Sequence, residues 1–231
     1  MKLTKLRRRL PASQKSGQPR DLFFFEGQCY RQGFRFVAGL DEAGRGCLAG
    51  PVVAAAVVFP PYLTIAGVDD SKKLSPQKRE ELYPQILEKA IAWGVGVVGP
   101  DEIDRMNILE ASKKAMELAL GYLKVPPDHL LIDGNFRITS AYPQTQIIRG
   151  DSLSFSIAAA SIIAKVTRDR TMVEWQERYP QFQFSRHKGY GTKIHLKEIR
   201  TYGLTELHRK SFAPCRQISM GESPLLSIST F

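Results

Sequence analysis

Two apolar runs separated by a charged turn constrain the fold of this chain more than any other feature. Residues 36–40 and 52–59 are rich in small and β-branched residues, which predicts two buried strands. The segment between them begins with Asp41 and Glu42. Side chains alternate across a strand, so these carboxylates cannot both face one apolar surface unless the backbone turns there. The pair is therefore either a polar hairpin turn with a surface ion pair or part of a metal site.

The rest of the turn contains Gly44, Arg45 and Gly46. Glycine lets a backbone turn tightly and approach another molecule closely. Arginine presents a planar set of donors that fits phosphate or carboxylate. Together with the apolar flanks, these residues favour the second alternative, a carboxylate metal site beside a loop that reads a partner through its backbone.

Two later predicted strands also end at a carboxylate. Residues 129–132 precede Asp133, and residues 145–148 precede Asp151. Sites in open α/β sheets form at the carboxyl ends of strands. We therefore expect one cluster of four carboxylates, made of Asp41, Glu42, Asp133 and Asp151. Such a cluster needs cations, and oxygen ligands without His or Cys indicate Mg²⁺ or Mn²⁺, with two ions per site as the usual device for phosphoryl displacement.

A second acidic residue, Asp169, competes with Asp151 for the fourth place. Both flank the helix predicted over residues 154–178, and on an unbroken helix they would share a face. They would also be roughly 27 Å apart, because a helix rises about 1.5 Å per residue. Only Asp151 lies on the strand-end side, whereas Asp169 is within i, i+4 reach of Lys165. We predict that Asp151 joins the cluster and that Asp169 forms an ordinary ion pair.

The remaining pattern is that of an α/β fold, in which strands come first and then alternate with helices. This order predicts a mixed sheet with an antiparallel start and a parallel continuation, flanked by helices, and a helical C-terminal part. We expect a bend or break in the first helix near Pro84. The other elements expected are a short strand at residues 63–68, a buried strand at residues 93–98, and helices over residues 76–92, 108–123, 154–178, 193–202 and 205–210.

Charge is distributed unevenly along the 231 residues, which carry a net charge of +10. Residues 1–35 hold nine basic and two acidic groups, and residues 165–210 hold eleven and five, whereas residues 36–164 have a net charge of −3. An acidic middle between basic segments suits a cation site inside a surface that meets a polyanion. A basic surface without a partner is the alternative.

Composition along the chain suggests one domain with two extensions. Residues 1–35 are predicted to be a basic, flexible N-terminal extension, although the aromatic residues of segment 21–34 could also pack on the domain. Residues 36–213 would be the catalytic domain, and the polar residues 214–231 a disordered tail.

Other features bear on the compartment of the protein. No apolar run is long enough to span a bilayer, and the basic start lacks the apolar stretch of a secretory signal, although an organellar transit peptide stays an alternative. The three cysteines, an odd number without a CxxC pair, argue against a disulfide framework and suit a reducing compartment. We expect a cytoplasmic monomer without a membrane partner.

Six motifs in order resemble type 2 ribonuclease H, the bacterial ribonuclease HII family. They extend from about residue 36 to residue 214 and read GLDEAGRGCLAGPVVAAAVV, DDSKKLS, LLIDGN, RGDSLSFSIAAASIIAKVTRDR, HKGYGT and HRKSFAP. The resemblance implies a ribonuclease H-like fold. It also implies endonucleolytic cleavage of RNA in RNA–DNA hybrids, including at single ribonucleotides within duplex DNA, that leaves 3′-hydroxyl and 5′-phosphate ends.

The resemblance further implies residue roles. The four carboxylates named above resemble the metal-binding set of the family, and Gly44, Arg45 and Gly46 resemble the loop that senses the ribose 2′-hydroxyl. That group alone separates RNA from DNA at a given nucleotide. Tyr190 resembles the residue that packs on the sugar at the RNA-to-DNA junction, and its glycine neighbours make a core position unfavourable.

Several basic residues complete the expected substrate surface. The natural phosphate contacts are Lys72, Lys73 and Lys188, although each of them alone fits a solvated loop equally well. The histidines at positions 187, 195 and 208 are expected to be structural or to face the substrate, because a metal-bound water needs no histidine base.

Two rival functions remain at this stage. One is a non-catalytic module that binds hybrids through the basic flanks. The four carboxylates argue against this function, because a protein that only binds a polyanion gains nothing from negative charge at its contact surface. The other is a nuclease of the same fold with a different substrate. The tail at residues 225–231 resembles a sliding-clamp peptide only faintly and is taken as a disordered end.

Overall fold

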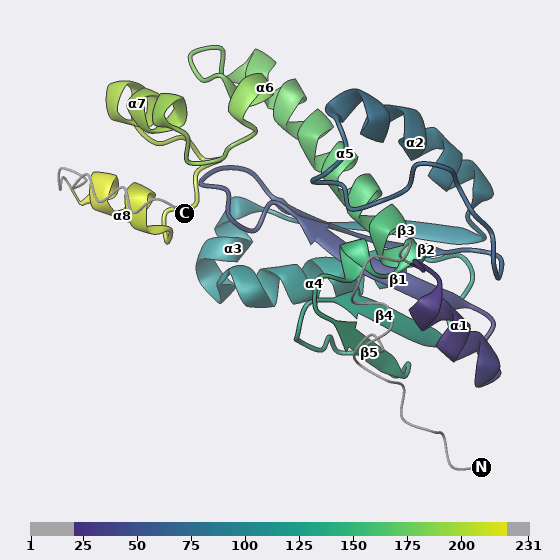
Figure 1. The fold of residues 1–231 in the computed structure, drawn as a ribbon. Helices are drawn as coiled ribbons and strands as arrows, with labels where there is room; N and C mark the ends of the chain where they lie inside the picture. Colours follow the sequence, from purple (N-terminus) through teal and green to yellow (C-terminus); the bar gives the residue numbers. More distant parts are fainter. Residues whose placement is uncertain (1–20, 221–231) are drawn as a thin grey trace.

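A five-stranded mixed sheet forms the centre of the structure, a computed structural model that describes residues 21–220. In spatial order the strands are β3 (Ala92–Val98), β2 (Val52–Val58), β1 (Val37–Ala43), β4 (His129–Asp133) and β5 (Gln144–Ile147). The first three pair antiparallel, and β1–β4 and β4–β5 pair parallel. The predicted α/β class, with its antiparallel start and parallel continuation, is confirmed (Figure 1).

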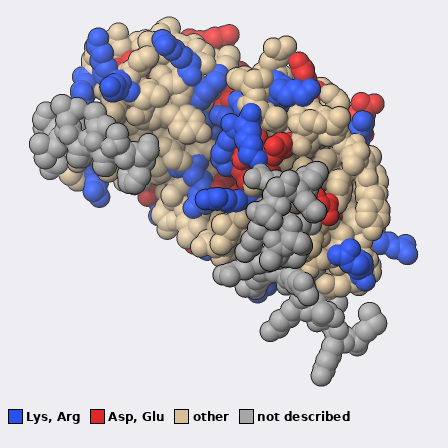
Figure 2. Space-filling view, viewed as in Figure 1, with Lys and Arg blue, Asp and Glu red and all other residues tan. Residues whose placement is uncertain are grey.

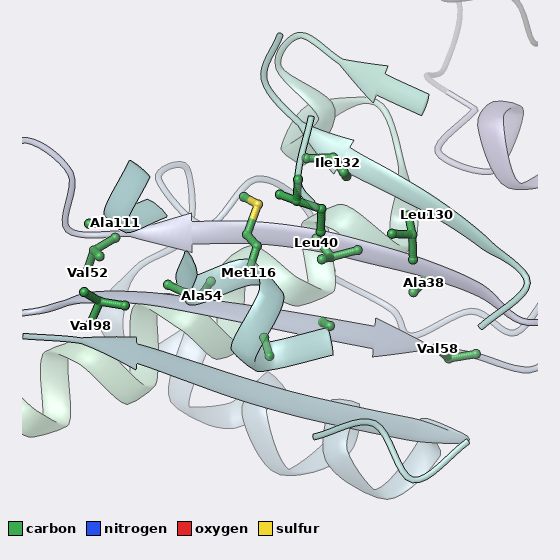
Figure 3. Packing of buried hydrophobic residues seen from close by; sticks show 14 of the residues in the cluster. Ala38, Leu40, Val52, Ala54, Val58, Val98, Ala111, Met116, Leu130 and Ile132 are labelled. Carbon is green, nitrogen blue, oxygen red and sulfur yellow. The ribbon is translucent and has the colours of Figure 1, made fainter. Parts of the chain in front are cut away.

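Helices cover both faces of this sheet. On one face, α3 (Pro100–Met106) and α4 (Ile108–Gly121) pack against the even-numbered residues of β2, and Figure 3 shows Met116 of α4 beside Leu40 of β1. On the other face lie α2 (Pro76–Lys89) and α5 (Phe155–Arg178). Because β2 is covered on both sides, all seven of its residues are buried, which explains its continuous apolar run.

The predicted helical C-terminal part is present at one end of α5. It comprises α6 (Phe184–His187), α7 (Lys193–Tyr202) and α8 (Ala213–Ser219), which lie away from α1 in Figure 1. Its core of Phe182, Phe184 and Cys215 also includes Leu48 and Ala49 of the loop after β1. The C-terminal part is therefore joined to the glycine-containing turn between β1 and β2.

A short helix, α1 (Phe24–Arg31), precedes the sheet. Phe25 and Cys29 on this helix are buried against β1, β4 and the start of α5. Residues 21–35 thus pack on the domain, where the sequence predicted a flexible extension up to residue 35. The aromatic residues that left this alternative open provide the contact, and residues 1–20 lie outside the described part of the chain.

The structure differs from the sequence prediction in the first half of the chain. Residues 63–68 form an irregular segment with a turn at residues 66–67 in place of a strand, and the positive φ angles of Tyr62 (62°) and Gly67 (90°) are incompatible with a strand at these two positions. Helix α2 continues through Pro84 without a break and ends at Lys89, because β3 begins at Ala92. Strand β3 was expected to be buried, but it is an edge strand whose residues alternate between buried and exposed.

Further differences concern the second half. Residues 205–210 form turns in place of the expected helix, and α8 extends to Ser219 where the sequence predicted disorder from residue 214. The buried thiol of Cys215 explains that order, because it anchors α8 in the C-terminal core. Helix α6 was not predicted, and neither were α1 and α3 in the first half of the chain. Within residues 21–220, no helix has the length and apolar character needed to cross a membrane.

Candidate active site

Three carboxylates from three neighbouring segments meet at one edge of the sheet. Asp41 comes from β1, Asp133 ends β4, and Asp151 lies in a single 3-10 turn between β5 and α5. One oxygen from each lies within 4.8 Å of the others, and Asp41 and Asp151 are almost fully buried. We call these residues the carboxylate cluster. The structure places Asp151 in it and places Asp169 elsewhere, 2.7 Å from Lys165 Nζ.

Glu42, the fourth expected ligand, lies next to the cluster but is not one of the three residues whose oxygens come together. Burial, and after it the charge of Asp133, raise the pKa of its carboxyl, although Arg45 works against that shift. Strand β1 continues to Ala43, so Asp41 and Glu42 alternate across it, whereas the sequence predicted that the strand ended before them. Glu42 Oε1 accepts a hydrogen bond from Arg45 at 3.2 Å, and Oε2 is buried without a partner in the described chain. An orphan carboxylate oxygen is costly to bury, so this atom is available to a ligand.

The cluster carries unbalanced negative charge. Burial raises the pKa of Asp41 well above its ordinary value, and Glu42, Asp133 and Asp151 reinforce that shift; burial also raises the pKa of Asp133. One cation, Lys72, offsets it: its Nζ lies 2.7 Å from Asp151 Oδ2, and although burial lowers its pKa, this contact raises the pKa overall. The oxygen-only donors and the excess of charge fit a hard divalent cation.

The backbone before α5 fixes the position of Asp151. Arg149 takes a left-handed conformation with φ 59°, and Gly150 N donates to Asp133 Oδ1 at 2.6 Å. A Cβ at Gly150 would lie 2.6 Å from Ile157 Cδ1 and 3.3 Å from Asp133 Oδ1, so a larger residue there would have to displace the Ile157 side chain. Ser154 then caps α5 by accepting from Ile157 N.

The loop between β1 and β2, residues 44–51, lies next to the cluster; we call it the glycine loop. Gly44 has φ 97°, a conformation that favours glycine. Arg45 is exposed, and its guanidinium lies 5.7 Å from the centre of the Phe136 ring. Within the described chain, the backbone N–H groups of Arg45 and Gly46 donate no hydrogen bond, and a Cβ at Gly46 would meet open space.

Tyr190 is attached to the glycine loop from the C-terminal part. It forms an isolated β-bridge with Cys47, and the residue is 41% exposed. Lys165 Nζ lies 5.4 Å and Arg168 Cζ 5.8 Å from the centre of the Tyr190 ring. Strand β1 thus carries Asp41 of the cluster and leads into the glycine loop, and the bridge to Cys47 attaches Tyr190 to that loop.

Comparison with known proteins assigns the chain to a family. The family model described as "Ribonuclease HII" matches residues 38–215. The chain belongs to the ribonuclease HII family. A curated ribonuclease HII of Geobacillus thermodenitrificans is 55% identical over 197 residues, which cover 85% of this chain and 76% of that relative. This membership makes the protein an endoribonuclease that acts on RNA–DNA hybrids.

Solved structures agree on the fold. The crystal structure of ribonuclease H2 from Pyrococcus horikoshii matches with a TM-score of 0.67 and 28% identity, covering 80% of this chain and 97% of that one. A Bst ribonuclease HIII solved in complex with Mn²⁺ matches with a TM-score of 0.59 and 21% identity over 80% and 70% of the two chains. The ribonuclease H fold expected from the motifs is confirmed.

Basic residues surround the acidic centre of this ribonuclease HII chain (Figure 2). A cavity of about 430 Å³ is lined by Asp70, Lys72, Lys73, Asp133, Gly134, Arg149, Asp151 and Ser152. Lys73 also forms an ion pair with Asp69 at 3.0 Å. Lys188, two residues before Tyr190, has a left-handed backbone with φ 51°, and burial lowers the pKa of its amine. Arg149 was not predicted, and its signal was available: a basic residue directly before the Gly150 turn.

The three histidines of the C-terminal part are structural. His187 lies 2.9 Å from Glu198, and its Nδ1 accepts from Gly189 N. His195 Nε2 lies 3.1 Å from His208 Nε2, and its Nδ1 lies 2.9 Å from the Tyr190 carbonyl oxygen, to which it donates. All three rings are buried. Of the two alternatives for these residues, support of the loop at residues 187–192 is the one observed.

Proposed function

We propose that this ribonuclease HII cuts duplex DNA at a single embedded ribonucleotide as well as RNA within longer hybrids. Cleavage would proceed by two-metal hydrolysis and leave 3′-hydroxyl and 5′-phosphate ends. One observation carries the proposal: the carboxylate cluster adjoins a loop whose N–H groups at Arg45 and Gly46 have no acceptor in the described chain. Metal ligands and unused donors are thus available at the same edge of the sheet.

The donor set fits Mg²⁺ or Mn²⁺. Asp41, Asp133 and Asp151 would hold the ions, with Glu42 contributing its unpartnered oxygen. When bound, the two ions supply an activated water and stabilise the leaving oxygen. In the absence of ions, Lys72 forms an ion pair with Asp151. Because the Lys72 side chain is 75% exposed, it can contact a substrate phosphate when an ion binds Asp151.

Recognition of the ribonucleotide would fall to the backbone. A 2′-hydroxyl can accept from the free N–H groups of Arg45 and Gly46, whereas a deoxyribose offers nothing there. The half-exposed ring of Tyr190 would pack on the neighbouring sugar. Lys73 and Arg149, which line the cavity at the cluster, would contact phosphates, and so would Lys188 next to the Tyr190 loop. Such contacts position the duplex without reading its sequence.

The chain offers no histidine as a general base at this site. His187, His195 and His208 are buried in the C-terminal part, and His129 is buried at the start of β4 with Nε2 3.0 Å from Thr145 Oγ1. Proton removal from the attacking water therefore depends on the metal and the carboxylates, in keeping with the oxygen-only site.

The test is a labelled DNA duplex with one ribonucleotide in one strand, incubated with the enzyme in Mg²⁺, in Mn²⁺ and in excess EDTA. We expect one nick at the ribonucleotide with either metal and none with EDTA. The matched control is the same duplex with deoxyribose at that position, which should stay intact. Cleavage in EDTA would contradict the metal mechanism, and binding without cleavage would favour the hybrid-binding module.

A further inference from the structure

Two arginine side chains are fully buried beneath the glycine loop. Arg168 comes from α5 and Arg209 from the segment before α8, and both have no exposed surface. Within residues 21–220 neither forms an ion pair with a carboxylate. A charge buried without a counter-ion costs free energy, so the structure must gain something else from these residues.

Both guanidinium groups donate to backbone carbonyls. Arg209 donates from Nε to Gly50 O at 3.0 Å, from NH1 to Arg45 O at 2.9 Å and from NH2 to Gly44 O at 2.7 Å. Arg168 makes the matching set, to the carbonyls of Pro51, Lys188 and Ala49 at 2.9–3.1 Å. Five of the six acceptors belong to the glycine loop, so its carbonyls point inward.

The position of Arg209 is itself fixed from two sides. Its N–H donates to Leu48 O at 2.8 Å, and Gly50 N donates to Leu207 O at 2.8 Å. On the other side, Asp104 of α3 accepts from the backbone N–H groups of Lys210 and Ser211 at 2.8 and 2.9 Å. Burial lowers the pKa of Arg209 to about 10, which leaves the guanidinium charged at neutral pH.

The inward carbonyls determine where the N–H groups point. The peptide bonds here are trans, and in a trans peptide the C=O and the following N–H point in opposite directions. Because Arg209 draws the carbonyls of Gly44 and Arg45 inward, the N–H groups of Arg45 and Gly46 face outward. These are the two donors that find no acceptor within the described chain.

We propose that Arg209, with Arg168 beside it, is a positioning residue that presents the N–H groups of Arg45 and Gly46 to the ribonucleotide and so sets the preference for ribose over deoxyribose. The inference rests on the proposed role of the glycine loop as the 2′-hydroxyl sensor. Arg168 adds the link to Lys188 O, so that Tyr190 and the loop keep one relative position. Gly44 packs on this arginine so closely that an added Cβ would overlap Arg168 Nε.

The test compares binding of two duplexes that differ by one 2′-hydroxyl. Affinities are measured by fluorescence anisotropy with Ca²⁺ as the divalent ion, and a gel verifies that neither duplex is cut. The variant Arg209→Lys keeps the positive charge and loses the planar fork that holds three carbonyls. We expect the wild-type preference for the ribonucleotide duplex to fall about tenfold in Arg209→Lys, with the affinity for the all-DNA duplex unchanged. Arg168→Lys should show a smaller loss in the same direction.

A core variant far from the loop separates positioning from general destabilisation. Met116→Ala opens a cavity under α4 on the opposite face of the sheet and should lower the melting temperature while keeping the wild-type preference. Folded arginine variants that keep the wild-type preference, or that lose affinity equally for both duplexes, would overturn the inference. A wild type that binds both duplexes equally would instead overturn the proposed role of the loop.

Amide hydrogen exchange on the wild type tests the same point without any substitution. We expect fast exchange at Arg45 and Gly46 in the free enzyme, and protection at both after the ribonucleotide duplex is added but not after the all-DNA duplex. Protection of these amides in the free enzyme would mean that they do not face outward, and the inference would then be wrong even if neither arginine variant folds.

Discussion

The carboxylate cluster and the glycine loop both place buried charge next to the end of β1, but they meet its cost in opposite ways. In the cluster, Asp41, Asp133 and Asp151 repel one another and share one lysine. Under the loop, Arg168 and Arg209 are each satisfied by three carbonyls. The charge of the cluster is therefore not neutralised until cations bind, whereas the buried guanidinium groups under the loop have their hydrogen-bond acceptors before any substrate binds.

The difference assigns separate tasks to the two regions. Repelling carboxylates bind a divalent ion strongly because the ion removes the repulsion. A loop held by buried guanidinium groups needs little reorganisation when a ligand binds. Its N–H groups therefore keep the geometry that would distinguish a ribose from a deoxyribose. Substitutions in the cluster should therefore affect catalysis more than stability, and substitutions under the loop should affect recognition and stability together.

The largest expected effect comes from breaking the cluster. Asp133→Asn should abolish metal-dependent nicking, because a ligand oxygen loses its charge, and should leave the melting temperature unchanged or raise it, because repulsion is relieved. Nicking of the single-ribonucleotide duplex and a thermal melt provide the two measurements. Asp101→Asn, at an exposed position on α3, is the control and should leave both values close to wild type. An Asp133→Asn enzyme that is active but unstable would mean that the cluster is structural.

The second effect separates two aspartates of the same helical region. Asp151→Asn should lose most of the activity and the rise in melting temperature that Mg²⁺ produces, because Asp151 belongs to the cluster. Asp169→Asn should keep most of the activity and lose about 1 kcal/mol of stability, since Asp169 contacts Lys165 at 2.7 Å and Arg79 at 3.8 Å. The opposite pattern in cleavage rate and melting temperature would reassign the ligand.

A third expectation is that pH acts on the two regions with opposite sign. His195 and His208 are buried beneath the loop at residues 187–192, and burial lowers the pKa of His195 to about 3 and that of His208 to about 4. The unfolded chain then binds more protons below pH 6.5, so stability should fall by about 1.4 kcal/mol per pH unit for each histidine as pH drops from 6.5 toward those values. Melting temperatures measured from pH 4.5 to 8 give the slope, and His208→Gln should flatten it.

The carboxylate cluster should show the reverse dependence in metal-free enzyme. Burial raises the pKa of Asp41 and Asp133, so the folded chain binds more protons above pH 4 and stability should fall as pH rises through the raised pKa values. Asp41→Asn in EDTA should remove most of this loss, and Mg²⁺ should remove it in the wild type. An identical pH profile for the wild type and Asp41→Asn in EDTA would contradict it.

How much of this was available from the sequence depends on the kind of interaction. The sequence predicted helices over residues 154–178 and 193–202, and α5 and α7 match these bounds, because apolar periodicity and a stop signal such as Gly203 lie within the element or directly after it. The rise of a helix alone separated Asp151 from Asp169, and the structure places only the former in the cluster. These features follow from spacing along one element.

Long-range contacts to backbone atoms left no sequence signal. Arg168 and Arg209 resemble surface residues by composition, and their carbonyl partners lie up to 165 positions away. The order of segment 21–35 and of α8 depends on tertiary burial of Phe25 and Cys215, whose surroundings no local pattern describes. Charged residues whose partners are carbonyls of a distant loop become visible only when the fold is known.

The smallest expected effect sharpens the comparison inside the loop itself. An added Cβ at Gly46 meets open space, so Gly46→Ala should change the free energy of unfolding by less than about 0.5 kcal/mol. It should weaken binding of the ribonucleotide duplex severalfold, because the methyl group lies where the sugar must approach.

Gly44→Ala should instead cost about 1–3 kcal/mol of stability, since Gly44 has φ 97° and packs on Arg168. Gly99→Ala, equally open but at the N-cap position before α3, is the control for the first variant, and Gly33→Ala, at φ 92° without neighbours, is the control for the second. Anisotropy and thermal melts on the four variants decide the matter: if Gly46→Ala binds both duplexes like the wild type, the loop does not meet the sugar at this position.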